Sequence, residues 1–132
     1  MPHLTLEYTS NLADRKPTPQ LMLGIHRHLE SSAGIKIGNC KTRWREVGEW
    51  VVGDGAGPSA FVHLDVRFLE GRTEEVRRAV GAGALELLKT HFLPAPEGVD
   101  LQITVEIQEI REGVYFKDPS GTLSGPPPAW NA

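Results

Sequence analysis

The sequence predicts an α/β (α+β) two-layer sandwich, in which a mixed four-stranded sheet carries two helices on one face. The first observation is the order of the periodic segments, which is strand, helix, strand and then strand, helix, strand again. The second is that the strand segments alternate apolar with polar residues, which is typical of a sheet with one buried face. The third is that each helical segment has a single apolar stripe and therefore needs only one covered side. We expect a duplicated β-α-β subunit whose halves share element order but no residue-level repeat.

In the first half, the chain enters a strand almost at once. Residues 4–8 alternate Leu, Thr, Leu, Glu and Tyr, which predicts a strand from residue 3. We expect this strand to hold the preceding Pro2 in a fixed place. Thr18 followed by a proline predicts a helix start, and the helix should end at 31–34, where small residues lead to a glycine. Alternation resumes over 40–45 and predicts the second strand.

The second half repeats this order with clearer signals. Residues 60–69 alternate as a half-buried strand, and Thr73 with two following glutamates predicts the start of a helix. The helix should close at 89–94, and residues 101–107 give the clearest alternation of the chain. We expect the buried stripe of this helix to consist of Val76, Val80, Gly83 and Leu87.

Length and composition exclude several classes of protein. With 132 residues and a net charge of −3, the chain has the size of one domain and lacks the basic excess of a general nucleic-acid binder. We expect a single domain over 1–117 and a Gly/Pro-rich tail over 118–132. No segment approaches the roughly 20 apolar residues that cross a membrane, and the start does not resemble a signal peptide. The single cysteine, Cys40, fits a reducing compartment, so we expect a cytoplasmic protein with no membrane or nucleic-acid partner.

Pro2 is the first candidate for chemistry. If Met1 is removed, the prolyl nitrogen becomes a secondary amine, whereas retention of Met1 leaves an amide without usable basicity. An amine acts as a base or nucleophile only when neutral, and burial or nearby cations favour the neutral form. A proline after an initiator methionine is also common without any function, so Pro2 alone identifies no activity.

Cationic side chains are the second set of candidates. Lys41 and Arg43 share one side of a strand, where same-face residues repeat about every 7 Å and could hold carboxylates set a few carbons apart. Arg72 follows Gly71 at a strand-to-helix junction, from which a guanidinium can reach a cleft. Solvated polar surface is the alternative interpretation for all three.

The remaining residues do not indicate metal or cofactor chemistry. His63 alternates with core residues and is interpreted as a structural or interface histidine, and Cys40 as a core residue. No Cys/His cluster, phosphate-binding glycine loop or Ser-His-Asp pattern is present in the sequence. We therefore expect no metal site and no cofactor.

Five short motifs in order resemble one known family. They are MPH at the start, AFVHLDV over 60–66, GRT over 71–73, ELLKTHF over 86–92 and YFK over 115–117. Together they resemble the 5-carboxymethyl-2-hydroxymuconate delta-isomerases of the tautomerase superfamily, over roughly residues 1–117. The resemblance implies a homotrimer without cofactor or metal that acts in aromatic compound catabolism, in the breakdown of homoprotocatechuate (3,4-dihydroxyphenylacetate).

The resemblance also implies roles for particular residues. Pro2 matches the family's amino-terminal proline, which moves a proton along a dienol to give the conjugated 2-oxo isomer. Arg72 matches an arginine that binds or polarises a substrate carboxylate, and Arg43 also falls on a family arginine. Lys41 stands where a family member has a functional arginine, and lysine keeps the charge but loses the bidentate fork.

Two alternatives stay open at this point. The first is a related tautomerase that acts on a smaller 2-hydroxydienoate or a phenylpyruvate-type enol, which Lys41 could favour. The second is a non-enzymatic oligomeric protein that binds anions in a cationic cleft, with Pro2 only structural. Comparing a triacid with a monoacid substrate separates the two enzymatic possibilities. Ligand binding without turnover would indicate the non-enzymatic binding protein.

Overall fold

The computed structural model describes residues 2–118, so the expected tail lies outside the described residues from position 119 onward. The regular elements follow the predicted order. They are β1 (His3–Thr9), α1 (Pro19–Ala33), β2 (Lys41–Val47), β3 (Ser59–Leu69), α2 (Glu74–Phe92) and β4 (Asp100–Ile110), with short 3-10 helices η1 (Ser10–Arg15), η2 (Ile37–Asn39) and η3 (Glu112–Val114).

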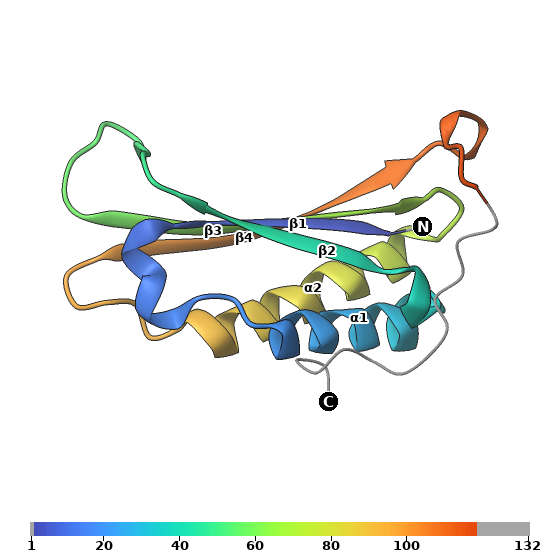
Figure 1. The fold of residues 1–132 in the computed structure, drawn as a ribbon, viewed down its shortest axis with the longest axis horizontal. Coiled ribbons are helices and arrows are strands. Elements are labelled where there is room, and N and C mark those ends of the chain that lie inside the picture. The colour runs from blue at the N-terminus through green and yellow to red at the C-terminus, as the bar shows by residue number, and fades with distance from the viewer. Residues whose placement is uncertain (1, 119–132) are drawn as a thin grey trace.

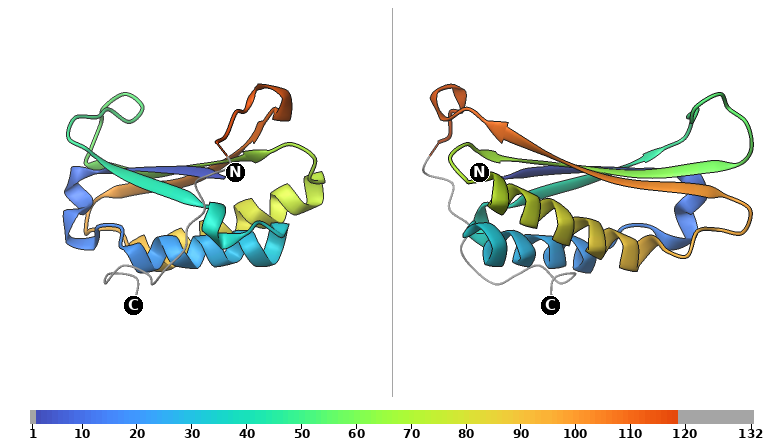
Figure 2. Two further views of the ribbon diagram at one scale, coloured as in Figure 1. Left: turned by 45° about the vertical axis from the view of Figure 1, so that its right-hand side comes forward. Right: turned by 180° about the vertical axis from the view of Figure 1, so that it is seen from behind.

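The four strands form one mixed sheet in the order β2-β1-β3-β4. β1 runs parallel to β2, β3 runs parallel to β4, and the central pair of β1 and β3 is antiparallel. Both helices cover the same face of the sheet, and the other face is left open (Figures 1 and 2). The predicted two-layer fold and its duplicated β-α-β order are confirmed. No helix in the described part of the chain is long and apolar enough to span a membrane.

The predicted helix ends are those of the structure. Thr18 Oγ1 accepts a hydrogen bond from Leu21 N at 3.2 Å, and Thr73 Oγ1 accepts one from Val76 N at 3.2 Å. Each cap satisfies a backbone N–H that has no partner within its helix. α1 ends at Gly34, which has a φ of 66°, a left-handed conformation that glycine adopts without steric cost.

The core lies between the sheet and the helices, and the expected stripe of α2 is only partly correct. The buried side chains of α2 are Val80, Ala84, Leu88 and Phe92. Leu87 packs at the edge of the core, while Gly83 faces α1, where a Cβ would lie 2.1 Å from the ring of His28. α2 must therefore pack against a second helix as well as the sheet, and beyond Val80 its buried positions move by one residue, to Ala84 and Leu88.

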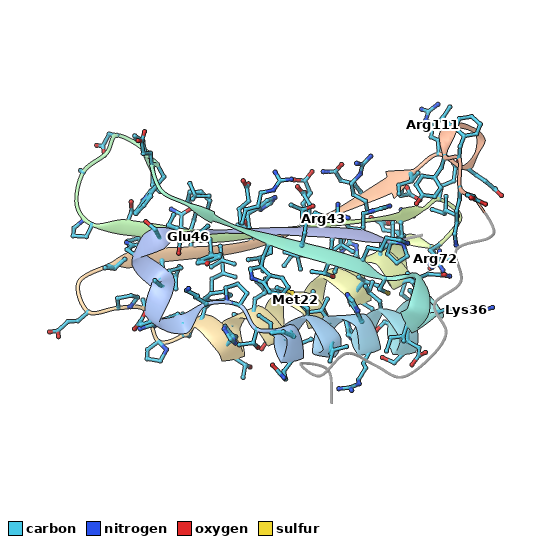
Figure 3. All side chains as sticks on the ribbon, viewed as in Figure 1. Met22, Lys36, Arg43, Glu46, Arg72 and Arg111 are labelled. Carbon is cyan, nitrogen blue, oxygen red and sulfur yellow. The ribbon has the colours of Figure 1, made fainter. Side chains whose placement is uncertain are left out.

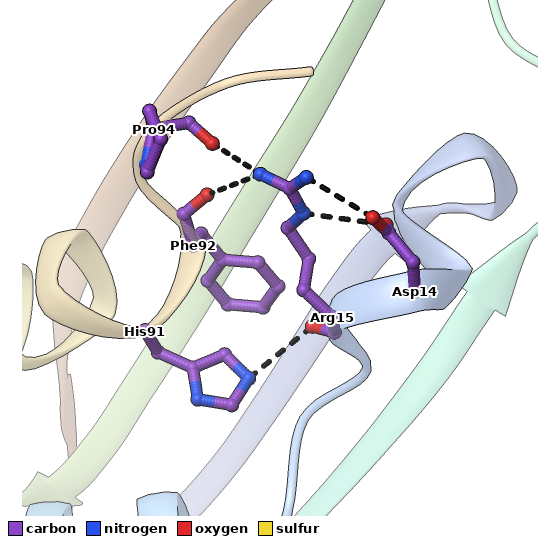
Figure 4. A network of polar contacts seen from close by, with 5 residues as sticks. All are labelled: Asp14, Arg15, His91, Phe92 and Pro94. Carbon is purple, nitrogen blue, oxygen red and sulfur yellow. Dashed lines mark hydrogen bonds and ion pairs between the residues drawn. The ribbon is translucent and has the colours of Figure 1, made fainter.

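A polar network ties η1 to the end of α2 (Figure 4). Arg15 Nη1 donates to the carbonyl oxygens of Phe92, at 3.2 Å, and Pro94, while its Nη2 contacts Asp14 Oδ2 at 3.1 Å. His91 Nε2 donates back to the carbonyl of Arg15 at 3.2 Å. One guanidinium thus satisfies the carbonyl of the last residue of α2 and one just beyond the helix, where the helix has no internal donors left.

Replacing Arg15 with alanine should lower the free energy of unfolding by about 1–3 kcal/mol, because two carbonyl groups lose a charged donor. Urea unfolding should show a lower midpoint with an unchanged slope. The matched control is Arg78→Ala on α2, whose ion pair with Glu74 is exposed, with side-chain exposures of 79% and 71%, and should cost at most about 0.5 kcal/mol. Equal midpoints for the two variants would contradict a role for the network.

Candidate active site

Pro2 lies buried at the start of β1 and lines a pocket of about 250 Å³. This pocket, which we call the proline pocket, is lined by Pro2, Gly34, Ile35, Lys36, Asn39, Phe68, Leu69 and Arg72. The carbonyl oxygen of Pro2 accepts a hydrogen bond from Lys41 N at 3.2 Å, which continues the β1–β2 ladder and fixes the backbone at that position. The prolyl ring is thereby held in a defined place.

The strand directions explain why these segments meet. β1 and β2 are parallel and begin at the same end of the sheet, so the connection from α1 into β2 passes beside Pro2. β3 is antiparallel to β1 and finishes at that same end, which brings Phe68 and Arg72 there. Three segments that are far apart in the sequence therefore line one pocket.

Arg72 is anchored so that part of its guanidinium stays available. Its Nε donates to the carbonyl of Ala33 at 2.9 Å, and its guanidinium carbon lies 5.4 Å from the centroid of the Phe68 ring. Within residues 2–118, no hydrogen bond or ion pair engages the two Nη atoms of Arg72. Arg72 therefore presents two aligned N–H donors, the geometry that binds a carboxylate.

Lys36 is a pocket residue that the sequence analysis missed. It follows the Gly34 cap, is exposed, and lies at the same end of the molecule as Arg72 (Figure 3). Its position was foreseeable, because a β-α-β crossover returns its second loop to the edge where the first strand begins. The proline pocket thus has two cationic side chains, Arg72 and Lys36.

Lys41 and Arg43 do not line the proline pocket. They pair in register with His3 and Thr5, whose side chains project from the open face of the sheet. Lys41 Nζ donates to the carbonyl of Asn39 at 3.2 Å, and Figure 3 shows Arg43 on the side of the sheet opposite Arg72. Of the four residues predicted to form the site, the structure brings Pro2 and Arg72 together and places Lys41 and Arg43 across the sheet.

Comparison with known proteins identifies the family of this chain. A family model described as 5-carboxymethyl-2-hydroxymuconate isomerase matches residues 2–120, which is most of the sequence. The chain belongs to this isomerase family. It is 29% identical over 117 residues to the 5-carboxymethyl-2-hydroxymuconate Delta-isomerase of Escherichia coli, and the match covers 89% of this chain and 93% of that protein.

Solved structures agree with this assignment. A 5-carboxymethyl-2-hydroxymuconate isomerase from Deinococcus radiodurans R1 matches with a TM-score of 0.79 and 33% identity, over 89% of this chain and 88% of that one. A protein described as Q0 fused 4-OT wild type symmetric trimer shares the fold, with a TM-score of 0.67, 16% identity and coverage of 92% and 94%. The resemblance drawn from five short motifs is confirmed, and the chain is a member of an isomerase family.

Away from the proline pocket, His63, Asp65 and Glu106 form a cluster of side chains that can ligate metals. His63 Nε2 lies 3.5 Å from Asp65 Oδ1 and 3.6 Å from Glu106 Oε1, and the three ligand atoms lie within 4.8 Å of one another. His63 Nδ1 also lies 2.6 Å from Thr104 Oγ1. These contacts place His63 in a polar cluster on the open face, and its interpretation as a structural or interface histidine stays a prediction.

Cys40 is a weak nucleophile at neutral pH, because little of its thiol is ionised. The side chain is half-buried against the core, and burial raises the pKa of its thiol from 9.0 to about 11. At pH 8 the folded protein therefore holds about a hundredfold less thiolate than the unfolded chain, because two pKa units separate the two states. A thiol reagent should react about a hundredfold more slowly with native protein than with protein in urea. Equal rates would contradict the buried environment of Cys40.

Proposed function

We propose that this isomerase converts 5-carboxymethyl-2-hydroxymuconate to its conjugated 2-oxo isomer in the breakdown of homoprotocatechuate, in the cytoplasm and without a cofactor. The observation that carries the proposal is the pairing of Pro2 and Arg72 in one pocket of a chain whose family match begins at Pro2. A base and a carboxylate-binding cation are thus adjacent.

In the proposed reaction, the neutral amine of Pro2 removes the proton of the dienol hydroxyl. The carbonyl forms as the double bonds shift, and the protonated amine then delivers the proton to a distal carbon. The proton count is unchanged, so no redox partner is needed. Arg72 binds a carboxylate and, with Lys36, stabilises the negative charge that develops on oxygen. Both cations also favour the neutral amine.

Two further assignments belong to this proposal. Lys41 and Arg43 bind substrate carboxylates from the open face at the same end of the sheet, as the family resemblance implies. The protein assembles as a homotrimer, which is supported by the fused 4-OT neighbour described as a symmetric trimer. Exposed apolar side chains also favour assembly, because Val51 is 77% and Phe116 is 88% exposed in the single chain. Light scattering tests the trimer.

The test of the reaction is an ultraviolet assay of 5-carboxymethyl-2-hydroxymuconate isomerisation. The protein is first checked by intact mass to confirm that Pro2 is its first residue. Turnover at a rate far above the spontaneous reaction is expected. No acceleration by correctly processed protein would overturn the proposed substrate.

A smaller substrate is the second candidate, and the size of the pocket favours it. Ligand pockets usually enclose about 300–1,000 Å³, whereas the proline pocket encloses about 250 Å³. A smaller 2-hydroxydienoate or a phenylpyruvate-type enol would fill this space. Faster turnover of such a monoacid than of the triacid would favour this candidate.

A further inference from the structure

A second pocket lies on the open face of the sheet, at the same end as Pro2. It encloses about 500 Å³, and its distinguishing feature is three arginines that come from three separate segments. Arg43 belongs to β2, Arg67 to β3, and Arg111 follows the end of β4. Figure 3 shows Arg43 and Arg111 on the same side of the sheet. We call this the arginine pocket.

The wall of the arginine pocket is held in place by Tyr115. The chain rises from β4 through η3 over the open face (Figure 1), and Tyr115 Oη lies 2.9 Å from His3 Nε2. Arg43 Nη2 donates to His3 Nδ1 at 3.0 Å. Because a guanidinium can only donate, His3 Nδ1 is the acceptor of the Arg43 bond. His3 Nε2 then carries the hydrogen and donates it in a hydrogen bond to Tyr115 Oη. The pocket is therefore built before any ligand binds.

The lining of this pocket carries more positive than negative charge. Within residues 2–118, the side chains of Arg67 and Arg111 make no hydrogen bond or ion pair. The one carboxylate of the lining, Glu109, lies 3.5 Å from Arg77 and is shared with it. Burial and the charges of Arg43 and Lys41 lower the pKa of His3, which favours its neutral ring. Three arginines thus line a pocket whose one acidic residue is paired with Arg77 of α2, and cationic clefts concentrate anions.

The spacing of the arginines indicates the kind of anion. Arg43 and Arg67 lie on the two strands that flank β1, opposite Thr5 and His3 respectively. Two strand spacings and an offset of two residues therefore place their backbones about 12 Å apart. Guanidinium groups that approach from opposite walls suit a ligand with separated planar anionic groups better than one compact phosphate. Each guanidinium can bind a carboxylate through two parallel hydrogen bonds.

We propose that the arginine pocket binds the carboxylate groups of a small polycarboxylate, with Arg67 and Arg111 as its principal ligands. Arg43 completes the set from β2. The volume suits a molecule of several carbons, and Ile110 and Val114 supply apolar contacts for its carbon skeleton. For Arg43 this inference rests on the proposed function, which gives it a substrate carboxylate; Arg67 and Arg111 are added here, and their role does not depend on Pro2 being the base.

The first experiment is a calorimetric titration of the full chain with propane-1,2,3-tricarboxylate, with propionate and inorganic phosphate as comparison ligands. Arg67→Gln and Arg111→Gln should each weaken tricarboxylate binding about tenfold or more, because each removes a charged hydrogen bond. The control is Arg45→Gln, an exposed residue of β2 outside the pocket lining, which should change affinity by less than about twofold. Both pocket arginines are exposed, and urea midpoints equal to that of the native protein confirm folding.

Three results would overturn the proposal. The first is an absence of tricarboxylate binding to the native protein, and the second is binding that neither Arg67→Gln nor Arg111→Gln weakens. The third is phosphate binding as tight as tricarboxylate binding. Because the titration involves no turnover, its failure is distinguishable from failure of the isomerase proposal.

Kinetics then distinguish the source of the carboxylate. If the pocket holds a remote carboxylate of the substrate, Arg67→Gln raises KM for 5-carboxymethyl-2-hydroxymuconate about tenfold without changing kcat, and leaves a monoacid enol unaffected. If the pocket holds a separate molecule, KM is unchanged in Arg67→Gln, and the added tricarboxylate binds the native protein together with substrate. Either result supports carboxylate binding by the arginine pocket.

Discussion

Protein that retains Met1 should isomerise 5-carboxymethyl-2-hydroxymuconate about 10²–10⁴ times more slowly than protein that begins at Pro2, the usual contribution of a general base. The reason is chemical: an acylated prolyl nitrogen is an amide and cannot accept the proton. Both forms are identified by intact mass, and their initial rates are compared in the ultraviolet assay. Treatment of the slow form with methionine aminopeptidase should restore the rate.

Pro2→Ala separates the position of the amine from its mere presence. An alanine amine is also basic near neutral pH, but its unconstrained backbone holds the nitrogen less firmly, so the rate should lie between those of the other two forms. Urea unfolding serves as the control, because Pro2 donates no hydrogen bond and only its carbonyl, which alanine keeps, bonds to Lys41 N. Full activity with Met1 retained would remove Pro2 from the role of base.

The fold was predictable because every element carries its own local signal. The alternation in β1 and β3 and the caps Thr18 and Thr73 are features of neighbouring residues, and they suffice to place the elements. The same alternation also determines the sides of the sheet. Pro2 has the parity of the inward-facing Leu4, whereas Lys41 and Arg43 pair with the outward-facing His3 and Thr5. Their same-face spacing and the family resemblance grouped these cations with Pro2, but strand parity separates them.

Other features depend on contacts that no local pattern contains. The buried positions of α2 differ from the expected ones because Gly83 faces His28 of α1. The residues of α2 alone do not predict this contact between the helices. The arginine pocket forms only because the segment after β4 turns back over the open face, where Tyr115 contacts His3. Lys36 is different, because it joins the proline pocket through the parallel direction of β1 and β2, which the predicted β-α-β order already implied.

Replacing Arg72 with alanine should lower kcat/KM for a carboxylate substrate about 10²–10³-fold, the usual effect of removing one charge-stabilising donor from an active site. Arg72→Lys should recover only part of this loss. Lysine keeps the positive charge, but it lacks the Nε–H that bonds the Ala33 carbonyl and the planar group that lies over Phe68. It also cannot offer two parallel donors to a carboxylate.

The ranking of these variants tests how Arg72 acts. If its fork binds the substrate, the order of activity is arginine, lysine and then alanine, with the difference expressed in kcat/KM and with urea midpoints that agree. Arg78→Ala is the matched control, because it removes an arginine of α2 whose ion pair with Glu74 is exposed, and it should leave the kinetics unchanged. If Arg72 only fixes the Ala33 loop, the lysine and alanine variants should lose stability together with activity. Unchanged kinetics in Arg72→Ala would exclude it from the site and leave Lys36 as the cation beside Pro2.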